Sequence, residues 1–355
     1  MLPSKPLPTP SLTLRHQRPT IFCGLIALLL ATCLISLCVG AVKIPVSDVL
    51  AALTGQREAS GLGNILWNLR IPRVLLGVLV GGALAAAGAL MQGLFRNPLA
   101  DPALIGASSG GALGAVFIIV LGSTIFPGIP LLSDLRALPF AAFAGALVVT
   151  WFVKSLAANG GYTAIATLLL VGVAVNALTS AMIGLATYLA TDVQLRTLSF
   201  WTLGSLGAAD WQVVTLAAPF CLTLIILAPF WATALNALAL GEAEAGHLGF
   251  KVERIKSLLI LLTAAGVGAS VAFTGIILFV GLVVPHLVRT LIGPDHRWLL
   301  PGSALLGAAL LVASDTLART IVAPAELPIG ILTAGFGAPF FLSMLLRQRG
   351  RALWG

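Results

Sequence analysis

Residues 74–95 read VLLGVLVGGALAAAGALMQGLF and contain no charged side chain. A helix of about 20 apolar residues is long enough to cross the hydrocarbon core of a bilayer. The whole chain of 355 residues has this character, since 59% of its residues are hydrophobic, only 9% are charged and its mean hydropathy is +1.05. Soluble domains carry about 25% charged residues. The composition therefore excludes a soluble protein and predicts an all-α integral membrane protein.

Uncharged runs of this kind recur along the chain and predict its membrane spans. One of them, residues 257–288, is interrupted at Thr274-Gly275, which predicts two helices there, the second one short. The expected fold is a single ten-helix bundle over residues 21–348, with tails over residues 1–20 and 349–355. The uncharged runs are residues 19–42, 74–95, 102–133, 137–153, 155–191, 211–241, 257–288, 298–314 and 327–346.

The few charges indicate how the bundle is oriented. Ten spans place both termini on one side, and if that side is the cytoplasm, thirteen basic and five acidic residues lie inside while seven of each lie outside. Loops rich in Lys and Arg stay in the cytoplasm, so the net charge of +8 is interpreted as an orientation signal rather than as a nucleic-acid-binding surface. The run 21–41 is expected to remain as the first helix. A cleaved signal peptide is the alternative, but the run is long and lacks a small-residue cleavage site.

The sequence lacks the motifs of the common catalytic and metal sites. It has no phosphate-binding G-x-x-x-x-G-K-[ST], no H-E-x-x-H and no G-x-S-x-G. The four cysteines lie in apolar runs without C-x-x-C spacing, which favours buried thiols. The acid that falls within a span, Asp315, precedes Arg319 by four residues, a spacing that predicts an ion pair rather than a proton or sodium relay. No catalytic or metal-ligating residue is predicted, and the energy for any transport must come from elsewhere.

The polar segment 236–256 stands out among the loops. Gly241, Gly246 and Gly249 divide it into two predicted short helices, the first acidic and the second basic. A helix–turn–helix with small residues at its crown can fit a groove on a partner protein. A plain connector between two spans is the alternative.

Several further motifs follow one another along the chain. They are Arg70-Ile-Pro-Arg73, Gly88-Ala-Leu-Met-Gln92, Arg96-Asn-Pro-Leu-Ala-Asp-Pro102, Gly106-Ala-Ser-Ser-Gly110, Phe200-Trp-Thr-Leu-Gly-Ser-Leu206, Pro285-His-Leu-Val-Arg289, Leu327-Pro-Ile-Gly330 and Gly337-Ala-Pro-Phe340. In this order they resemble the iron-chelate, haem and cobalamin permease family, the membrane subunits of type II ABC importers, and the greatest similarity is to the haem-importing members.

The resemblance implies a permease of ten helices in the bacterial inner membrane, with both termini cytoplasmic. It implies four kinds of partner: a second copy of the chain, two ATPase subunits, a periplasmic binding protein and the surrounding lipid. No cofactor is held permanently, ATP is hydrolysed on the partner subunits, and haem or a related iron chelate passes through as cargo. A ferric siderophore or cobalamin is the alternative cargo. An ion-coupled secondary transporter and a channel or scaffold without energy coupling are the alternative classes.

The resemblance also assigns roles to residues at the two ends of the bundle. Arg70 and Arg319 are expected to dock the binding protein at the outer surface, with interfacial anchoring as the alternative. Segment 236–256 matches the family's coupling helices, which seat in a cleft of the ATPase. The residues expected to couple are Leu240, Gly241, Glu242, Ala245, Gly246, Leu248 and Gly249.

The fifth span, residues 163–190, is expected to line the translocation path. A cytoplasmic gate is expected at Ala164, Ile165, Ala166 and Thr167, where the sequence departs from the Ser/Thr-rich stretch of cobalamin-type members. Asn176 and Ser180 are predicted polar points on the path. Ordinary hydrogen bonds between helices are the alternative for both of these side chains.

Overall fold

The computed structural model describes residues 12–40, 42–54, 61–122 and 135–352, and they are mostly helical. In chain order the elements are α1 (Leu12–Cys38), α2 (Val46–Leu53), α3 (Gly61–Ile65), η1 (Leu66–Arg70), α4 (Ile71–Leu94), η2 (Pro102–Ile105), α5 (Ala107–Val116), η3 (Phe117–Gly122), η4 (Leu135–Ala137), α8 (Leu138–Ala157), β1 (Ala158–Asn159), β2 (Tyr162–Thr163), α9 (Ile165–Leu189), α10 (Asp192–Leu203), α11 (Trp211–Leu227), η5 (Ala228–Trp231), α12 (Ala232–Leu238), α13 (Glu242–His247), α14 (Val252–Thr274), α15 (Val280–Ile292), α16 (His296–Ala318) and α17 (Ile329–Ala352).

The expected ten spans are confirmed among these helices. In the described part of the chain, seven helical stretches are long and apolar enough to cross a membrane. The shorter apolar helices Ala107–Gly122, Val280–Ile292 and Ile329–Met344 bring the number to ten. The predicted break also occurs, because α14 ends at Thr274 and α15 begins at Val280. Gly275 has a φ of +70°, and a Cβ there would lie 2.0 Å from the carbonyl oxygen of Trp201, so this turn requires glycine.

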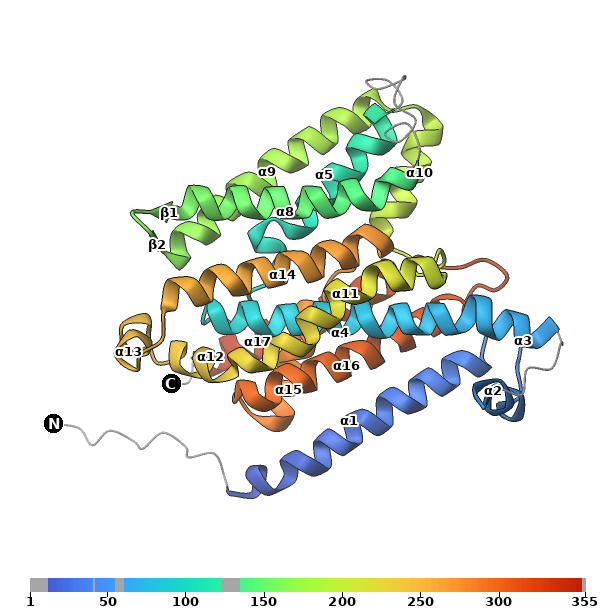
Figure 1. Ribbon diagram of the computed structural model, residues 1–355, viewed down its shortest axis with the longest axis horizontal. Coiled ribbons are helices and arrows are strands. Elements are labelled where there is room, and N and C mark those ends of the chain that lie inside the picture. The colour runs from blue at the N-terminus through green and yellow to red at the C-terminus, as the bar shows by residue number, and fades with distance from the viewer. Residues whose placement is uncertain (1–11, 41, 55–60, 123–134, 353–355) are drawn as a thin grey trace.

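Helix α4 is the centre of the bundle. It is buried along nearly its whole length and packs against α16, α11, α15 and α14 (Figure 1). Two close backbone approaches hold it there. A Cβ on Gly81 would lie 2.4 Å from the carbonyl oxygen of Gly307 on α16, and a Cβ on Gly88 would lie 1.8 Å from that of Gly281 on α15. Small residues in these spans therefore serve tight packing within one chain.

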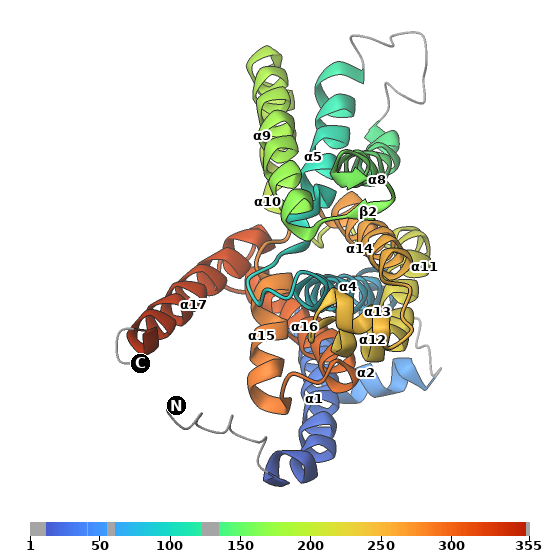
Figure 2. The same ribbon diagram turned by 90° about the vertical axis from the view of Figure 1, so that its left-hand side faces the viewer.

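A second group of helices, α5, α8 and α9, is joined to the centre by the contact between α8 and α14. Helices α9 and α17 stand at the periphery, and α1 packs mainly along α16 (Figure 2). Many apolar side chains on α9 and α17 are exposed in the single chain, among them Leu170, Leu185, Phe336 and Leu342.

An even number of crossings places both termini at the same end of the bundle, and the structure has this arrangement. The short helix α13, the β1–β2 hairpin, the first turns of α1 and the last turns of α17 lie at one end, which we call the α13 end (Figure 1). Helices α2, α3 and α10 lie at the opposite end, which we call the α2 end (Figure 1). Contacts between distant segments tie each end together. At the α13 end, for example, the Asn236 amide donates to Asp295 over 2.8 Å.

Candidate functional site

The segment expected to meet an ATPase contains one short helix, α13, and not the two that the sequence predicted. Gly241 at φ +139° and Gly249 at φ +88° flank α13, and glycine tolerates both conformations. After Gly249 nothing separates the basic residues from the apolar run that follows. Lys251 is therefore the N-cap of α14, and Lys256 lies inside that helix rather than in a helix of its own.

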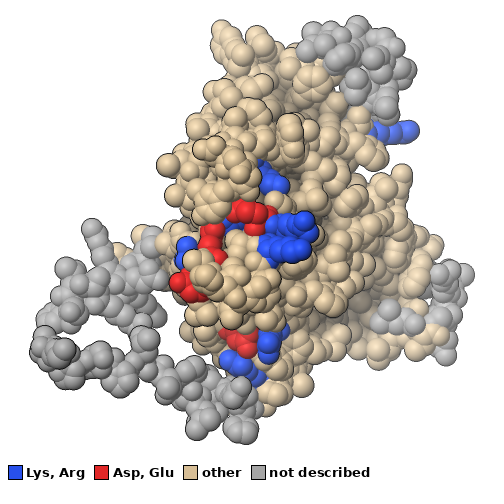
Figure 3. Space-filling model, turned by 60° about the vertical axis from the view of Figure 1, so that its left-hand side comes forward, with Lys and Arg blue, Asp and Glu red and all other residues tan. Residues whose placement is uncertain are grey.

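Helix α13 presents a small apolar surface at its end of the molecule. Leu240 and Leu248, on either side of it, are 70% and 62% exposed. A Cβ on Gly246 would meet nothing within 4 Å, whereas Ala245 is fully buried and fixes the helix to the bundle. Charged side chains gather near the centre of this face, and much of the surface around them is uncharged (Figure 3). The predicted coupling residues thus divide into exposed ones and ones that anchor α13.

Beside α13 lies a cluster of polar groups around Lys256, a residue that is only 2% exposed. The Lys256 ammonium donates to Glu242 at the start of α13 over 2.5 Å and to Glu253 on α14 over 2.9 Å. It also donates over 2.8 Å to the carbonyl oxygen of Thr163 and lies 4.6 Å from the ring centroid of Tyr162. We call Lys256, Glu242, Glu253, Tyr162 and Thr163 the Lys256 cluster.

Further hydrogen bonds close the Lys256 cluster into a network. The Tyr162 hydroxyl donates to Glu242 over 3.2 Å, and the Thr163 backbone N–H donates to Glu253 over 3.0 Å. Charge-assisted bonds of this kind are stronger than bonds between neutral groups. The buried ammonium thereby joins three elements, α13, α14 and the β1–β2 hairpin.

The β1–β2 hairpin leads directly into α9, the fifth span. Ala158 pairs with Thr163 and Asn159 with Tyr162, around a tip formed by Gly160 and Gly161. Ala164 is the N-cap residue of α9. Among the other predicted gate residues, Ile165 is half-buried, whereas Ala166 and Thr167 are exposed. The predicted gate therefore lies directly after the segment that the Lys256 cluster holds.

The two polar points expected on the path differ in their surroundings. The Asn176 carbonyl oxygen accepts from the Ser109 hydroxyl over 2.5 Å, and its amide donates to the carbonyl oxygen of Ala103 over 3.0 Å. Asn176 thus ties α9 to α5 and η2, which is the interhelical alternative for this residue. Ser180 is exposed, one of a stripe of exposed residues on α9 that includes Ala166, Leu170 and Val173.

At the α2 end, Arg70 and Arg319 were expected to face the outer surface, but both side chains are buried. They are 5% and 8% exposed, and their guanidinium groups cap the C-terminus of α1. Arg70 donates to the carbonyl oxygens of Leu37 and Val42, and Arg319 donates to the carbonyl and hydroxyl oxygens of Ser36 over 2.5 and 2.7 Å. The last carbonyls of a helix lack partners within it and carry partial negative charge. The two cations supply partners for this end of α1.

The sequence reasoning missed the strongest ion pair at this end. Asp315 pairs with Arg319 at 3.5 Å, as predicted, but its main partner is Arg73 on α4, which binds both of its oxygens over 2.9–3.1 Å. Arg73 also binds Glu326 over 2.9 and 3.0 Å. Arg73 and Asp315 are 242 positions apart. The sequence signal for this pair was weak. Arg73 directly precedes the uncharged run 74–95, and no acidic residue near it in the sequence indicates a partner.

In the described part of the chain, no group of three or more His, Cys, Asp or Glu side chains is placed to hold a metal ion. The four cysteines are free.

Comparisons with known proteins agree with this architecture. The model of the FecCD transport family matches residues 28–347. The chain is 51% identical to the hemin transport system permease protein HmuU of Yersinia pestis over 286 residues, which cover 81% of this chain and 84% of that protein. It is 41% identical to the vitamin B12 import system permease protein BtuC of Klebsiella pneumoniae over 341 residues, covering 95% and 96% of the two chains.

A solved structure is similar over nearly the full length. It is an inward-facing conformation of a metal-chelate type ABC transporter, with a TM-score of 0.79 and 31% sequence identity, covering 93% of this chain and 99% of the other. Family model, relatives and structure agree over most of the ten spans. The chain belongs to the FecCD transport family and is the membrane-spanning permease subunit of a type II ABC importer.

Proposed function

We propose that this permease moves haem, or a related iron chelate, from a periplasmic binding protein into the cytoplasm across a bacterial inner membrane. ATP hydrolysed on two separate subunits drives the movement by alternating access. The similarity to a hemin permease supports haem as cargo. The departure of residues 164–167 from the Ser/Thr-rich stretch of cobalamin-type members supports the same choice.

The observation that carries the mechanism is the Lys256 cluster. An ATPase that seats against α13 moves Glu242 with it, and the ammonium of Lys256 transmits that movement to Thr163. Thr163 is followed by Ala164, the N-cap residue of α9 and the first residue of the predicted gate. Closure of the ATPase subunits on ATP therefore displaces the start of the fifth span.

The remaining partners are assigned by exposure and charge. The excess of basic residues supports a cytoplasmic location for the α13 end and both termini. The exposed apolar faces of α9 and α17 support a second copy of the chain packed around a shared path. Docking of the binding protein at Arg70 and Arg319 remains a prediction, and it requires carboxylates of that protein to compete with the carbonyl oxygens at the end of α1.

Reconstitution tests the proposal directly. The permease is placed in proteoliposomes with its ATPase, and the binding protein is loaded with haemin outside. We expect haemin uptake that requires ATP and the binding protein and that persists when an ionophore collapses ion gradients. Uptake that follows the ion gradient, or is independent of ATP, would contradict the proposal.

Cobalamin is the second candidate cargo, because BtuC relatives match nearly the whole chain. Absorption spectra of the binding protein separate the two. A shifted Soret band on adding haemin, with no competition from cyanocobalamin, supports haem, whereas binding of cyanocobalamin alone assigns the permease to cobalamin import.

A further inference from the structure

A groove of about 530 Å³ runs between α8 and α14 at the α13 end of the bundle. Its walls are one stripe of each helix, spaced three or four residues apart so that the side chains share a face. From α8 come Leu147, Thr150, Trp151 and Lys154, and from α14 come Glu253, Arg254, Ser257, Leu258, Ile260, Leu261 and Ala264. At its polar end the groove adjoins a hollow beside α13, because Glu253 and Arg254 line both of them.

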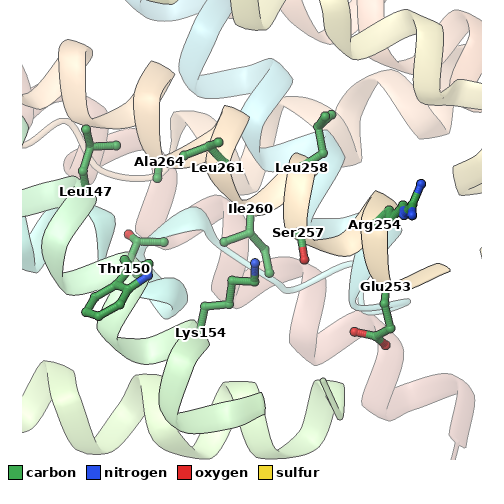
Figure 4. Close-up of a pocket in the computed structure, with 11 residues that line it drawn as sticks. Leu147, Thr150, Lys154, Glu253, Arg254, Ser257, Leu258, Ile260, Leu261 and Ala264 are labelled. Carbon is green, nitrogen blue, oxygen red and sulfur yellow. The ribbon is translucent and has the colours of Figure 1, made fainter. Parts of the chain in front are cut away.

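The groove is polar at one end and apolar at the other (Figure 4). Glu253 and Arg254 lie at one end, Leu147 and Ala264 lie at the other, and the Lys154 side chain reaches across from α8 toward Ile260 and Ser257 of α14 (Figure 4). Because α8 and α14 are both membrane spans, the apolar part of the groove lies at membrane depth. Its polar part lies where the two helices leave the bilayer. Trp151 is 68% exposed on the rim, and tryptophan is enriched at this depth of a membrane.

The two cations that line the groove, Lys154 and Arg254, are unpaired. Within the described residues, neither the Lys154 ammonium nor the Arg254 guanidinium has a hydrogen bond or an ion pair. Glu253, the one carboxylate in the groove, is already bound to Lys256 and to the Thr163 N–H. Arg254 also lies in the first turn of α14, where the helix dipole disfavours a positive charge. The dipole of α14 therefore does not stabilise a positive charge at Arg254.

We propose that this groove binds an anionic phospholipid. The phosphate headgroup lies between Lys154 and Arg254, and an acyl chain follows Leu147, Leu261 and Ala264 toward the middle of the bilayer. Basic pockets between membrane spans on the cytoplasmic side are suited to anionic headgroups. The proposal depends on the chain's spanning a membrane and not on the identity of its cargo.

The groove and the Lys256 cluster share one residue, Glu253. The Glu253 carboxylate is bound to Lys256 and to the Thr163 N–H, and neither Lys154 nor Arg254 pairs with it. Both cations are therefore left for a headgroup phosphate.

Native mass spectrometry of the full-length permease, released from nanodiscs, tests the site. The probes are phosphatidylglycerol and phosphatidylethanolamine with identical acyl chains, mixed in equal amounts. We expect phosphatidylglycerol to be retained preferentially by the wild type. The double variant Lys154→Gln/Arg254→Gln should lose that preference about tenfold. The control Lys251→Gln/Arg297→Gln removes the same charge at the same end of the molecule, outside the groove, and should keep it.

Several results would overturn the proposal. They are equal retention of the two lipids by the wild type, an unchanged preference in Lys154→Gln/Arg254→Gln, and an equal loss in the control. Displacement of the lipid by millimolar inorganic phosphate would show that the groove selects a free anion. Weakened ATPase association with unchanged lipid retention would identify the two cations as a protein contact. Haemin uptake is measured separately, so failure of the lipid site is distinguishable from failure of the proposed transport.

Discussion

The ammonium of Lys256 lies 2.5 Å from the carboxylate of Glu242 and so joins α14 to the first residue of α13. The same ammonium holds the hairpin that leads into the fifth span. A single buried cation therefore connects the segment expected to contact the ATPase to the segment expected to gate the path.

Replacing Lys256 by methionine should uncouple ATP hydrolysis from transport. The variant removes three charge-assisted or polar contacts but keeps the length of the side chain. Each such bond contributes about 1.5–3 kcal/mol, so we expect transport per ATP hydrolysed to fall about tenfold or more. Lys251→Met, at an exposed position five residues earlier, is the control. The ratio of haemin uptake to phosphate release in proteoliposomes measures the effect. An unchanged ratio in Lys256→Met would remove the cluster from the mechanism.

Replacing Gly246 by tryptophan should weaken ATPase association without affecting the permease fold. A side chain at this position meets nothing within 4 Å in the single chain, so the bundle accommodates it. The added bulk instead projects from α13. We expect the same melting temperature and an association at least about tenfold weaker, or about 1.4 kcal/mol. Gly24→Trp, also in open space but on α1, serves as the control. Normal association of Gly246→Trp would place the ATPase contact elsewhere.

Gly88→Ala should destabilise the bundle itself. The new Cβ would lie 1.8 Å from the carbonyl oxygen of Gly281, which forces α4 and α15 apart. Overpacking of this kind costs about 1–3 kcal/mol or more. Thermal unfolding in detergent should show a lower midpoint for Gly88→Ala and no change for Gly24→Ala. Equal midpoints would mean that the two helices separate without cost.

Arg319 allows docking to be distinguished from helix capping. Arg319→Gln removes the guanidinium, whereas Ser36→Ala removes only one of its acceptors and leaves the cation in place. If Arg319 binds a carboxylate of the binding protein, Arg319→Gln should lower binding-protein-stimulated ATP hydrolysis several-fold and Ser36→Ala should not. Equal stimulation in wild type and Arg319→Gln would leave Arg319 with the capping role alone.

Asp295 predicts a dependence of stability on pH at the α13 end. Burial acts to raise the pKa of its carboxyl. Hydrogen bonds from Asn236 and the Arg297 N–H, together with the charges of Arg18 and Arg297, outweigh burial and hold the pKa below the ordinary value of 3.8. A lowered pKa contributes stability that is present above the unfolded value and is lost as the pH falls through the folded value. The difference in melting temperature between wild type and Asp295→Asn should therefore shrink as the pH falls from 5 to below 3.8. A difference that stays constant over this range would contradict the assignment.

The spans were predictable because a bilayer imposes one requirement on every crossing segment. Backbone groups within it must pair internally, and charged side chains are costly there. Uncharged runs and the Thr274-Gly275 break were therefore enough to place the ten crossings. Outside the membrane the backbone can pair with water, so this requirement no longer applies. In segment 236–256 the sequence predicted two short helices, and the structure has one, α13.

The polar contacts were not predictable, because they join residues that are distant along the chain. Glu253 and Lys256 have the i,i+3 spacing of a helical ion pair, yet nothing in the sequence places Thr163 beside them. Arg319 follows the last residue of α16, whereas Arg70 lies at the junction of η1 and α4, within one helical stretch. Whether such a side chain points outward or caps a neighbouring helix depends on which helix packs beside it, and a single sequence does not specify that.

The capping of α1 has a consequence for the order in which the protein is assembled. This helix precedes the other nine spans, so it leaves the ribosome before them. Its C-terminal carbonyl groups accept hydrogen bonds from Arg70, at the start of the second span, and from Arg319, which follows the ninth. The capping of the first helix is therefore completed only when almost the whole chain has been synthesised. A translation product that stops before residue 319 would lack one of the two guanidinium groups that bind the end of α1.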